Sequence, residues 1–174
     1  TRAALTVALG DGSLYIAKCG PKKTPRVHIG LRHSVKQLAY MEHKVKHLKE
    51  FMPTKAKIHH VLGKSGFKNK KVYPMVHFGT SNKHLKAAYN ILRPNGYKEI
   101  TPALLSMLGA RAAAWLYMDD GYFDATNARI DISMGSHSDQ EIEMTIDWME
   151  GLTGARGVLA KRSYTWNNER RIER

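Results

Sequence analysis

Two apolar segments, each followed by an acidic residue and a glycine, constrain the fold of this chain most strongly. Residues 3–10 read AALTVALG and precede DG, and residues 102–118 read PALLSMLGARAAAWLYM and precede DDG. Thr101 as N-cap and Pro102 at the first helical position predict the start of the second segment, and glycine is a natural helix stop. The sequence therefore predicts two buried helices of one design, the second of them longer.

A strand with strict alternation is expected after each helix. One face is apolar in both copies: Val27, Ile29 and Leu31 in the first, Ile130, Ile132 and Met134 in the second. The opposite faces are polar: Arg26, His28 and Arg32 in the first, Arg129, Asp131 and Ser133 in the second. A period of two indicates strands that bury one face and expose the other.

Each strand leads into a predicted capping box and an amphipathic helix. The boxes are SVKQ at residues 34–37 and SDQE at residues 138–141. The apolar stripes that follow are Leu38, Met41, Val45, Leu48 and Met52 in the first copy, and Ile142, Thr145, Ile146 and Met149 in the second. VLGK at residues 61–64 is matched by VLAK at residues 158–161, and each opens a basic stretch with turn-forming residues. A strand, a turn and a strand are expected to follow in both copies.

The repeat predicts an α+β pseudo-dimer with a first half at residues 1–100 and a second at residues 101–174. The first copy continues through a helix near residues 82–92, for which the second has no counterpart. We therefore expect a second copy that is incomplete at its C-terminal end. The chain begins with Thr and shows no secretory signal, so we expect a missing start and a protein that is not secreted.

The positive charge is concentrated in one part of the chain. Of the 28 Lys and Arg residues, 15 lie within residues 18–71 beside only two acidic residues, and the formal net charge of the chain is +13. Such a block attracts polyanions in a salt-dependent way, which favours nucleic acid as the partner. The alternatives are a solvated lysine-rich face and an acidic membrane surface. The membrane alternative is weaker, because no basic amphipathic helix carries Trp or Phe along its apolar side.

The sequence also argues against a membrane-spanning protein, a protein with an internal disulfide and several kinds of zinc protein. The sequence has no run of eighteen apolar residues, which a transmembrane helix would need. The single cysteine, Cys19, excludes an internal disulfide and CxxC-type zinc sites, and there is no HExxH motif.

Asp11 and Asp120 are the carboxylates that end the two predicted buried helices. A carboxylate at a helix C-terminus is disfavoured by roughly 0.3–1 kcal/mol, and a second carboxylate nearby adds repulsion. A divalent cation removes both penalties, and carboxylate oxygens are the ligands that Mg²⁺ prefers. The alternative is turn chemistry alone, since Asp-Gly is common after helices. The paired occurrence beside a basic block favours a metal-dependent reaction on a phosphodiester.

The chain resembles a double-motif, single-chain LAGLIDADG homing endonuclease with a DDG-type second motif. The resemblance rests on ALTVALGDG at residues 4–12 and AAWLYMDDG at residues 113–121, with support from residues 40–43, 77–85 and 98–102. It implies two αββαββα halves, signature helices at their interface, and sheets lying along the DNA major groove. It also implies cleavage of both DNA strands, with Mg²⁺ or Mn²⁺ as the cofactor and a long asymmetric target site read by a monomer.

The resemblance further implies roles for individual residues. Asp11 and Asp120 are the expected metal ligands, with the Gly10 backbone at the first site and Asp119 as a weaker second-motif ligand. Lys98 is the expected basic residue that stabilises charge on the reacting phosphate, although a surface lysine is an equal alternative.

Positions on the polar strand faces and on the basic hairpins are the expected DNA contacts. They are Lys18, Lys22, Lys23, Arg26, His28, Arg32, Lys68, Lys70, Lys71, Tyr73, Arg129, Asp131, Ser133, Lys161, Arg162, Arg170 and Arg171.

Three alternative functions stay open from the sequence. An RNA maturase of the same fold would bind its own intron RNA and would not need the two acidic residues. A non-catalytic DNA-binding repressor would not need them either. An HNH-type nuclease, suggested by His59, His60, His77 and His84, is the weakest alternative. The host compartment, an organelle or the cytoplasm of a prokaryotic or phage host, is not fixed by the sequence.

Overall fold

The computed structural model describes residues 1–17, 24–64, 72–160, 162–166 and 169–173, with the backbone alone for residue 64 and the last two segments. The chain divides into two compact units, Thr1–Asn90 and Ile91–Arg174. Within the described part, no helix has the length and apolar character needed to cross a bilayer.

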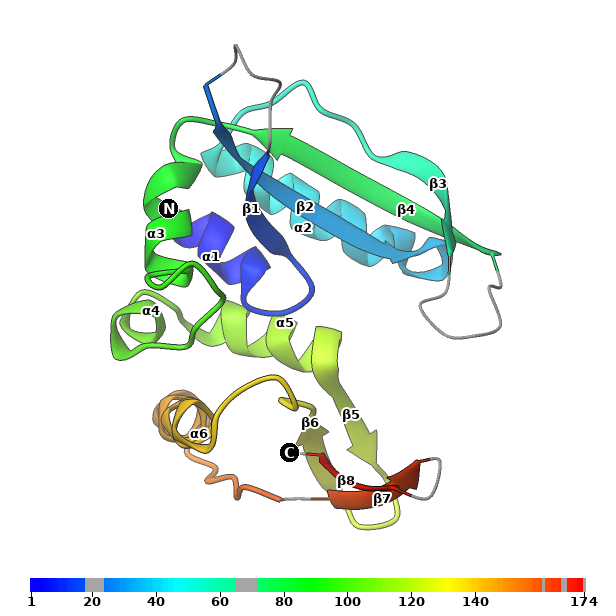
Figure 1. The fold of residues 1–174 in the computed structure, drawn as a ribbon, viewed down its shortest axis with the longest axis vertical. Coiled ribbons are helices and arrows are strands. Elements are labelled where there is room, and N and C mark those ends of the chain that lie inside the picture. The colour runs from blue at the N-terminus through cyan, green and yellow to red at the C-terminus, as the bar shows by residue number, and fades with distance from the viewer. Residues whose placement is uncertain (18–23, 65–71, 161, 167–168, 174) are drawn as a thin grey trace. The chain divides into compact units, whose positions relative to one another are not determined.

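The first unit has the element order αββαββα (Figure 1). Its helices are α1 (Arg2–Ala8), α2 (Leu38–Phe51) and α3 (Leu85–Leu92), and a short 3-10 helix, η1 (Val35–Gln37), precedes α2. Its strands are β1 (Ser13–Ala17), β2 (Arg26–Ser34), β3 (His59–Lys64) and β4 (Val72–Ser81). They form one antiparallel sheet in the order β1-β2-β4-β3.

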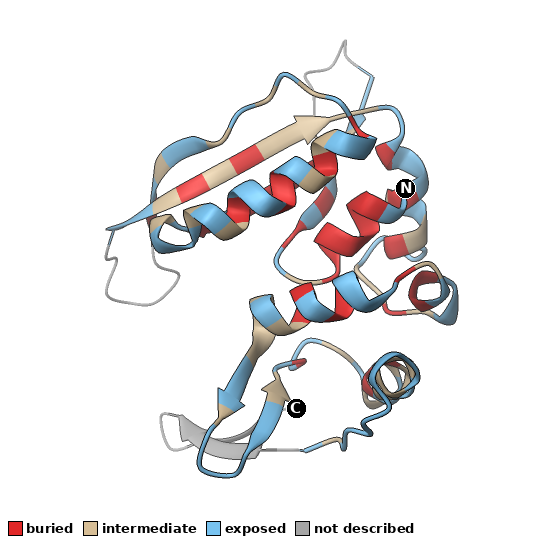
Figure 2. Cartoon of the chain, turned by 180° about the vertical axis from the view of Figure 1, so that it is seen from behind, coloured by how far each residue is buried: buried red, intermediate tan, exposed pale blue. Residues whose placement is uncertain are grey.

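The core of the first unit lies between one face of this sheet and α2. Met41, Val45 and Leu48 of α2 are buried, as are Ile29 and Leu31 of β2, which confirms both predicted apolar faces (Figure 2). The other face of the sheet carries basic side chains such as Arg26 and Arg32 together with the exposed rings of Tyr15 and Tyr73, because successive residues of a strand point to opposite sides. The fold thus separates an apolar layer from a polar surface.

The second unit repeats the element order with a divided first helix. It consists of α4 (Pro102–Ser106), α5 (Ala110–Asp120), β5 (Gly121–Asp124), β6 (Arg129–Ile132), α6 (Asp139–Thr153), β7 (Arg162–Trp166) and β8 (Glu169–Glu173). A cluster of Ile100, Leu105, Met134 and Ile142 forms its core, with Trp148 packed against it. The α+β class predicted from the repeat is confirmed.

Two details of the predicted repeat are wrong. Residues 102–118 are not one helix, because Gly109 adopts an extended conformation (φ −141°, ψ −169°) and starts α5 anew. Ser34 caps η1 by accepting from the Lys36 N–H at 3.4 Å, so Gln37 lies just ahead of α2 and residues 34–37 form no reciprocal capping box.

The prediction that Ile130 lies on a buried face is also wrong. Phe123 and Ile130 face each other across β5 and β6 and are 59% and 62% exposed. These two strands pair only with each other in the described part of the chain, whereas the first unit assembles all four strands in one sheet. A two-stranded ribbon covers less apolar surface than a four-stranded sheet does.

The second predicted capping box is confirmed in full and fixes the start of α6. The Ser138 hydroxyl accepts from the Glu141 N–H at 3.3 Å, and the Glu141 carboxylate accepts from the Ser138 N–H at 2.8 Å. The same carboxylate accepts from the Ile100 N–H at 2.8 Å, which ties the segment before α4 to α6. Burial alone would raise the pKa of Glu141, but these hydrogen bonds outweigh it and lower the pKa to about 2.

We predict that Glu141→Gln destabilises the protein by about 1–3 kcal/mol at pH 7, since it removes charge-assisted hydrogen bonds. The lowered pKa of Glu141 means that its stabilisation is fully present above the ordinary value of 4.5 and is lost as pH falls towards 2. Urea unfolding at pH 7 and pH 3 measures both effects. The exposed Glu143→Gln on the same helix is the control, and equal unfolding of the two variants at pH 7 would contradict the assignment.

Candidate metal centre and nucleic-acid interface

Asp11 stands in the turn between α1 and β1. All residues from Ala3 to Ala8 are buried, so α1 is buried on every side. The Asp11 side chain, in contrast, is 43% exposed. A carboxylate just past a helix C-terminus lies in the negative end of the helix dipole, a position that a cation stabilises.

A glycine follows the carboxylate in both units because a side chain there would collide with the preceding helix. A Cβ on Gly12 would run into the Val7 carbonyl oxygen, and a Cβ on Gly121 would run into the Tyr117 ring and carbonyl. The reason is space, since neither glycine has a positive φ. This close approach lets the chain pass directly from the helix into β1 or β5, with an acidic residue at the junction.

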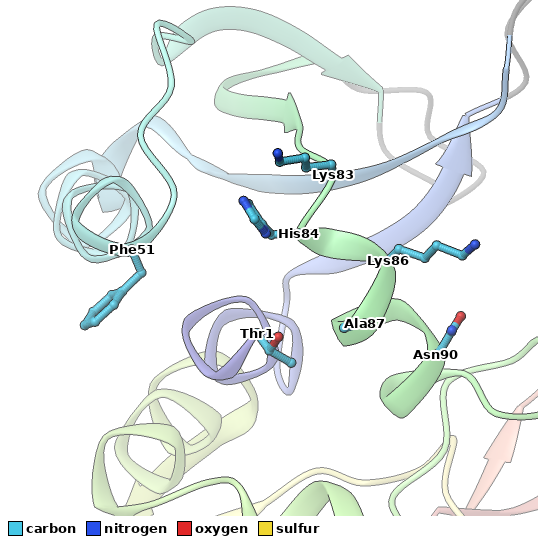
Figure 3. A pocket seen from close by; sticks show the side chains of 7 residues that line it. All are labelled: Thr1, Phe51, Lys83, His84, Lys86, Ala87 and Asn90. Carbon is cyan, nitrogen blue, oxygen red and sulfur yellow. The ribbon is translucent and has the colours of Figure 1, made fainter.

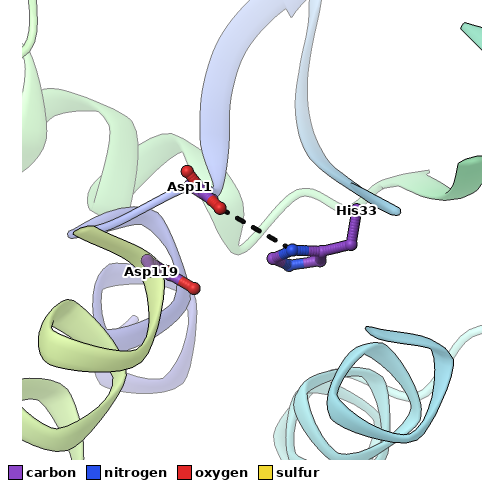
Figure 4. A group of neighbouring side chains, drawn as sticks. All are labelled: Asp11, His33 and Asp119. Atoms are coloured by element: carbon purple, nitrogen blue, oxygen red, sulfur yellow. Dashed lines mark ion pairs between the residues drawn. The ribbon is translucent and has the colours of Figure 1, made fainter. Parts of the chain in front are cut away.

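His33 is the side chain that faces Asp11 within the first unit. It lies near the end of β2, its side chain is 1% exposed, and its Nδ1 is 3.6 Å from the Asp11 Oδ2 (Figure 4). The two groups offer one oxygen and one nitrogen ligand atom side by side, a donor set that fits a divalent metal ion. Sequence reasoning missed His33, although its alternation with Ile29 and Leu31 places it on the buried face.

Aromatic and cationic side chains of α2 lie behind His33. The Tyr40 ring is 5.4 Å from the His33 ring, and the Lys44 Nζ lies 4.3 Å over the Tyr40 ring. Lys44 is fully buried. The sequence carried a signal for this, because Lys44 falls three residues after Met41, within the apolar stripe.

The predicted second-unit residues occupy the corresponding junction. Asp119 and Asp120 form the last turn of α5 and are partly buried. The Asp120 backbone carbonyl accepts a hydrogen bond from the Ser133 N–H at 2.8 Å, which continues the β5–β6 ladder as far as Asp120. Lys98 lies partly buried in the loop between α3 and α4, and Gly10 lies in the turn after α1. Their roles stay predictions.

The polar face of the four-stranded sheet gathers basic and aromatic side chains. Arg26 and Arg32 of β2 are exposed, as predicted, and His28 stacks on Tyr15 of β1 with ring centroids 5.7 Å apart. Gly30 lies opposite Gly79 at the centre of this face, so the middle of the sheet carries no side chain there.

A row of three positively charged or protonatable side chains crosses the same face. His77 of β4 lies opposite Arg32 of β2 on one side and opposite His59 of β3 on the other. Burial lowers the pKa of the His77 imidazole below its ordinary value of 6.5, and the charges of Arg32 and His59 lower it further.

The other predicted DNA contacts are spread over both units. Tyr73 is half exposed on β4. In the second unit Arg129 is engaged within its own hairpin, 3.3 Å from Asp124 and 3.2 Å from Asp131, while Ser133 is exposed. Strand β7 contains Arg162, and strand β8 contains Arg170 and Arg171. The remaining predicted contacts lie outside the described residues: Lys18, Lys22, Lys23, Lys68, Lys70, Lys71 and Lys161.

A separate open pocket of about 610 Å³ lies beside α3. It is lined by Thr1, Phe51, Lys83, His84, Lys86, Ala87 and Asn90 (Figure 3). None of the predicted catalytic, metal or DNA-contact residues is among them, so this pocket is distinct from the Asp11–His33 pair.

Both units follow a related α+β order, and each places an acidic residue at or just after the end of a helix, directly before a glycine and a strand. The family model described as the LAGLIDADG DNA endonuclease family matches residues 6–151. The chain belongs to the LAGLIDADG DNA endonuclease family.

Solved structures of homing endonucleases share the fold. The structure of I-WcaI bound to its DNA recognition sequence is 20% identical, with a TM-score of 0.63 over 99% of this chain and 75% of that one. A G20S variant of I-DmoI, in complex with its target DNA in the presence of Mg, is 17% identical, with a TM-score of 0.55 over 99% of this chain and 86% of that one. I-DmoI in complex with DNA and Mn is 16% identical, with a TM-score of 0.55 over the same shares of the two chains. Comparison with curated proteins gives no match.

We predict that Arg32→Gln raises the pKa of His77, because it removes a cation beside the imidazole. A pH titration of the histidine ring signals by NMR measures the shift. Arg26→Gln, on the same strand and face but outside the row of three, should leave the His77 titration unchanged. If His77 titrates identically in Arg32→Gln and in the wild type, the close approach of the Arg32 guanidinium to the His77 imidazole is contradicted.

Proposed function

We propose that this protein is a site-specific endonuclease that cuts both strands of double-stranded DNA, with divalent metal held by Asp11 in the first unit and Asp120 in the second. The family assignment supports a DNA endonuclease. The DDG form of the second motif and the assignment of Mg²⁺ or Mn²⁺ as the cofactor belong to the proposal.

The observation that carries the proposal is the acidic junction built into each unit. Asp11 follows the buried helix α1, and Asp120 ends α5. In each case the next residue is a glycine that admits no side chain. Turn chemistry alone would not require the same crowded junction twice. Asp11 and Asp120 would hold a divalent ion, which would supply activation of a water and charge stabilisation at the leaving oxygen of a phosphodiester.

The surrounding residues orient the carboxylates and the substrate. The Gly10 backbone and Asp119 are the proposed additional ligands. We assign Lys98 the role of stabilising negative charge on the reacting phosphate.

The polar face of the β1-β2-β4-β3 sheet is the proposed DNA surface of the first unit. Arg26 and Arg32 provide cationic groups that can bind phosphates or guanine edges. Tyr15 and His28, stacked on the same face, provide an aromatic surface beside the two arginines.

The two units present different side chains at related positions. Arg129 and Asp131 lie on β6 and Ser133 directly follows it, at the positions that match Arg26, His28 and Arg32 of the first unit. One monomer with two different reading surfaces suits a long asymmetric target, because each surface reads one half of the site.

Two functions without cleavage remain as outcomes of the test: an RNA maturase that binds its intron, and a DNA-binding repressor. Neither requires the carboxylates, whereas the endonuclease does.

We predict that Asp11→Asn and Asp120→Asn each lower double-strand cleavage by roughly 100-fold or more while DNA binding persists, since the carboxylates act on the transition state. The measurement is cutting of a randomised-site plasmid library in Mg²⁺ and in Mn²⁺, followed by binding to the selected site. Asp147→Asn, an exposed acid on α6, is the matched control and should cleave as the wild type does.

Discrete cuts that persist in both variants would contradict the metal assignment. If no library member is cut and intron RNA is bound equally well by all the proteins, the maturase function replaces the proposed one. Equal binding of duplex DNA without cleavage would indicate the repressor.

A further inference from the structure

The contact between Asp11 and His33 is not a hydrogen bond. Its Oδ2–Nδ1 distance of 3.6 Å exceeds the usual range for an N–H···O bond, about 2.7–3.2 Å. Two ligands that bind one ion at about 2.1 Å each lie roughly 3.0–3.5 Å apart. The observed distance is close to the spacing of two ligands of a shared ion.

The His33 ring is held in place by its surroundings. It is almost completely buried on β2, and the Tyr40 ring of α2 packs against it at 5.4 Å with an interplanar angle of 60°. The buried Lys44 in turn contacts the Tyr40 ring through a cation–π contact of 4.3 Å. Such packing orients an imidazole in advance and so reduces the entropy lost when it binds an ion.

The second unit uses its matching histidine differently. His137 precedes the cap residue Ser138 just as His33 precedes Ser34. However, the His137 Nδ1 lies 3.3 Å from the Glu141 Oε1, within the capping box of α6. The nitrogen that faces a junction carboxylate in the first unit therefore faces a structural carboxylate in the second.

We propose that His33 supplies a nitrogen ligand beside Asp11, so that the first-unit centre binds a transition-metal ion of the Co²⁺ or Zn²⁺ kind more tightly than Mg²⁺. Imidazole suits such ions, whereas Mg²⁺ prefers oxygen ligands. The inference deepens the proposed function and rests on it for the presence of metal at Asp11. It makes the two centres chemically unequal.

The test is the affinity of the whole, DNA-free protein for Co²⁺ and for Mg²⁺ at pH 7.5, measured by isothermal titration calorimetry. We predict that His33→Gln weakens the tightest Co²⁺ site on the order of 10–100-fold and changes the Mg²⁺ affinity by less than about 3-fold, since Gln retains an oxygen donor. His137→Gln is the matched control and should keep the wild-type Co²⁺ affinity. Unchanged Co²⁺ affinity in His33→Gln would overturn the proposal.

Substitution of the buried His33 can disturb folding. A second measurement therefore uses the wild-type protein instead of the His33→Gln variant. In the wild-type protein, substoichiometric Co²⁺ should shift or broaden the His33 ring signals in NMR spectra. Asp11→Asn, at an exposed side chain, should abolish this effect. Ring signals of His33 that do not respond to Co²⁺ would also overturn the proposal.

The failure of this inference can be distinguished from failure of the proposed function. If DNA is cut in Mg²⁺ and His33→Gln binds Co²⁺ as the wild type does, only the nitrogen ligand is wrong. If Co²⁺ binding depends on His33 but no DNA is cut under any metal, the metal site stands and the endonuclease function fails.

Discussion

Burial of the short helix α1 on every side is the constraint on which the first unit depends. An apolar helix of this length is not stable alone and requires a layer around it. The buried residues of α1 hold the turn at Gly10 in place, and Gly12 permits the immediate start of β1. The Asp11 carboxylate is thus positioned by packing, at the place where a helix dipole favours a cation.

The same sheet then performs two separate tasks. Its apolar face packs on α2, and its polar face carries the arginines and the row formed by Arg32, His77 and His59. Because alternate residues of β2 point to opposite faces, one strand can provide both Arg32 on the polar face and the buried His33 beside Asp11. The basic face of the sheet and the Asp11–His33 pair are therefore linked through adjacent residues of one strand.

Much of the fold could be predicted from periodicity, because the repeat supplied each pattern twice. The stripe of α2, the buried face of β2 and the capping box at Ser138 follow from local rules. The break at Gly109 and the exposure of Ile130 do not, since they depend on backbone conformation and on which strands share a sheet. Asp11 could be found from its motif, whereas His33 and Lys44 acquire meaning only when β2 and α2 pack together.

In the proposed function, one carboxylate from each unit holds metal at the phosphodiesters to be cut. The most direct measurement is an anomalous difference map from a crystal of the protein with its selected DNA target and Mn²⁺. We expect Mn²⁺ peaks at about 2.0–2.3 Å from carboxylate oxygens of both Asp11 and Asp120. A well-ordered DNA complex whose Mn²⁺ peaks lie away from both carboxylates would contradict the claim.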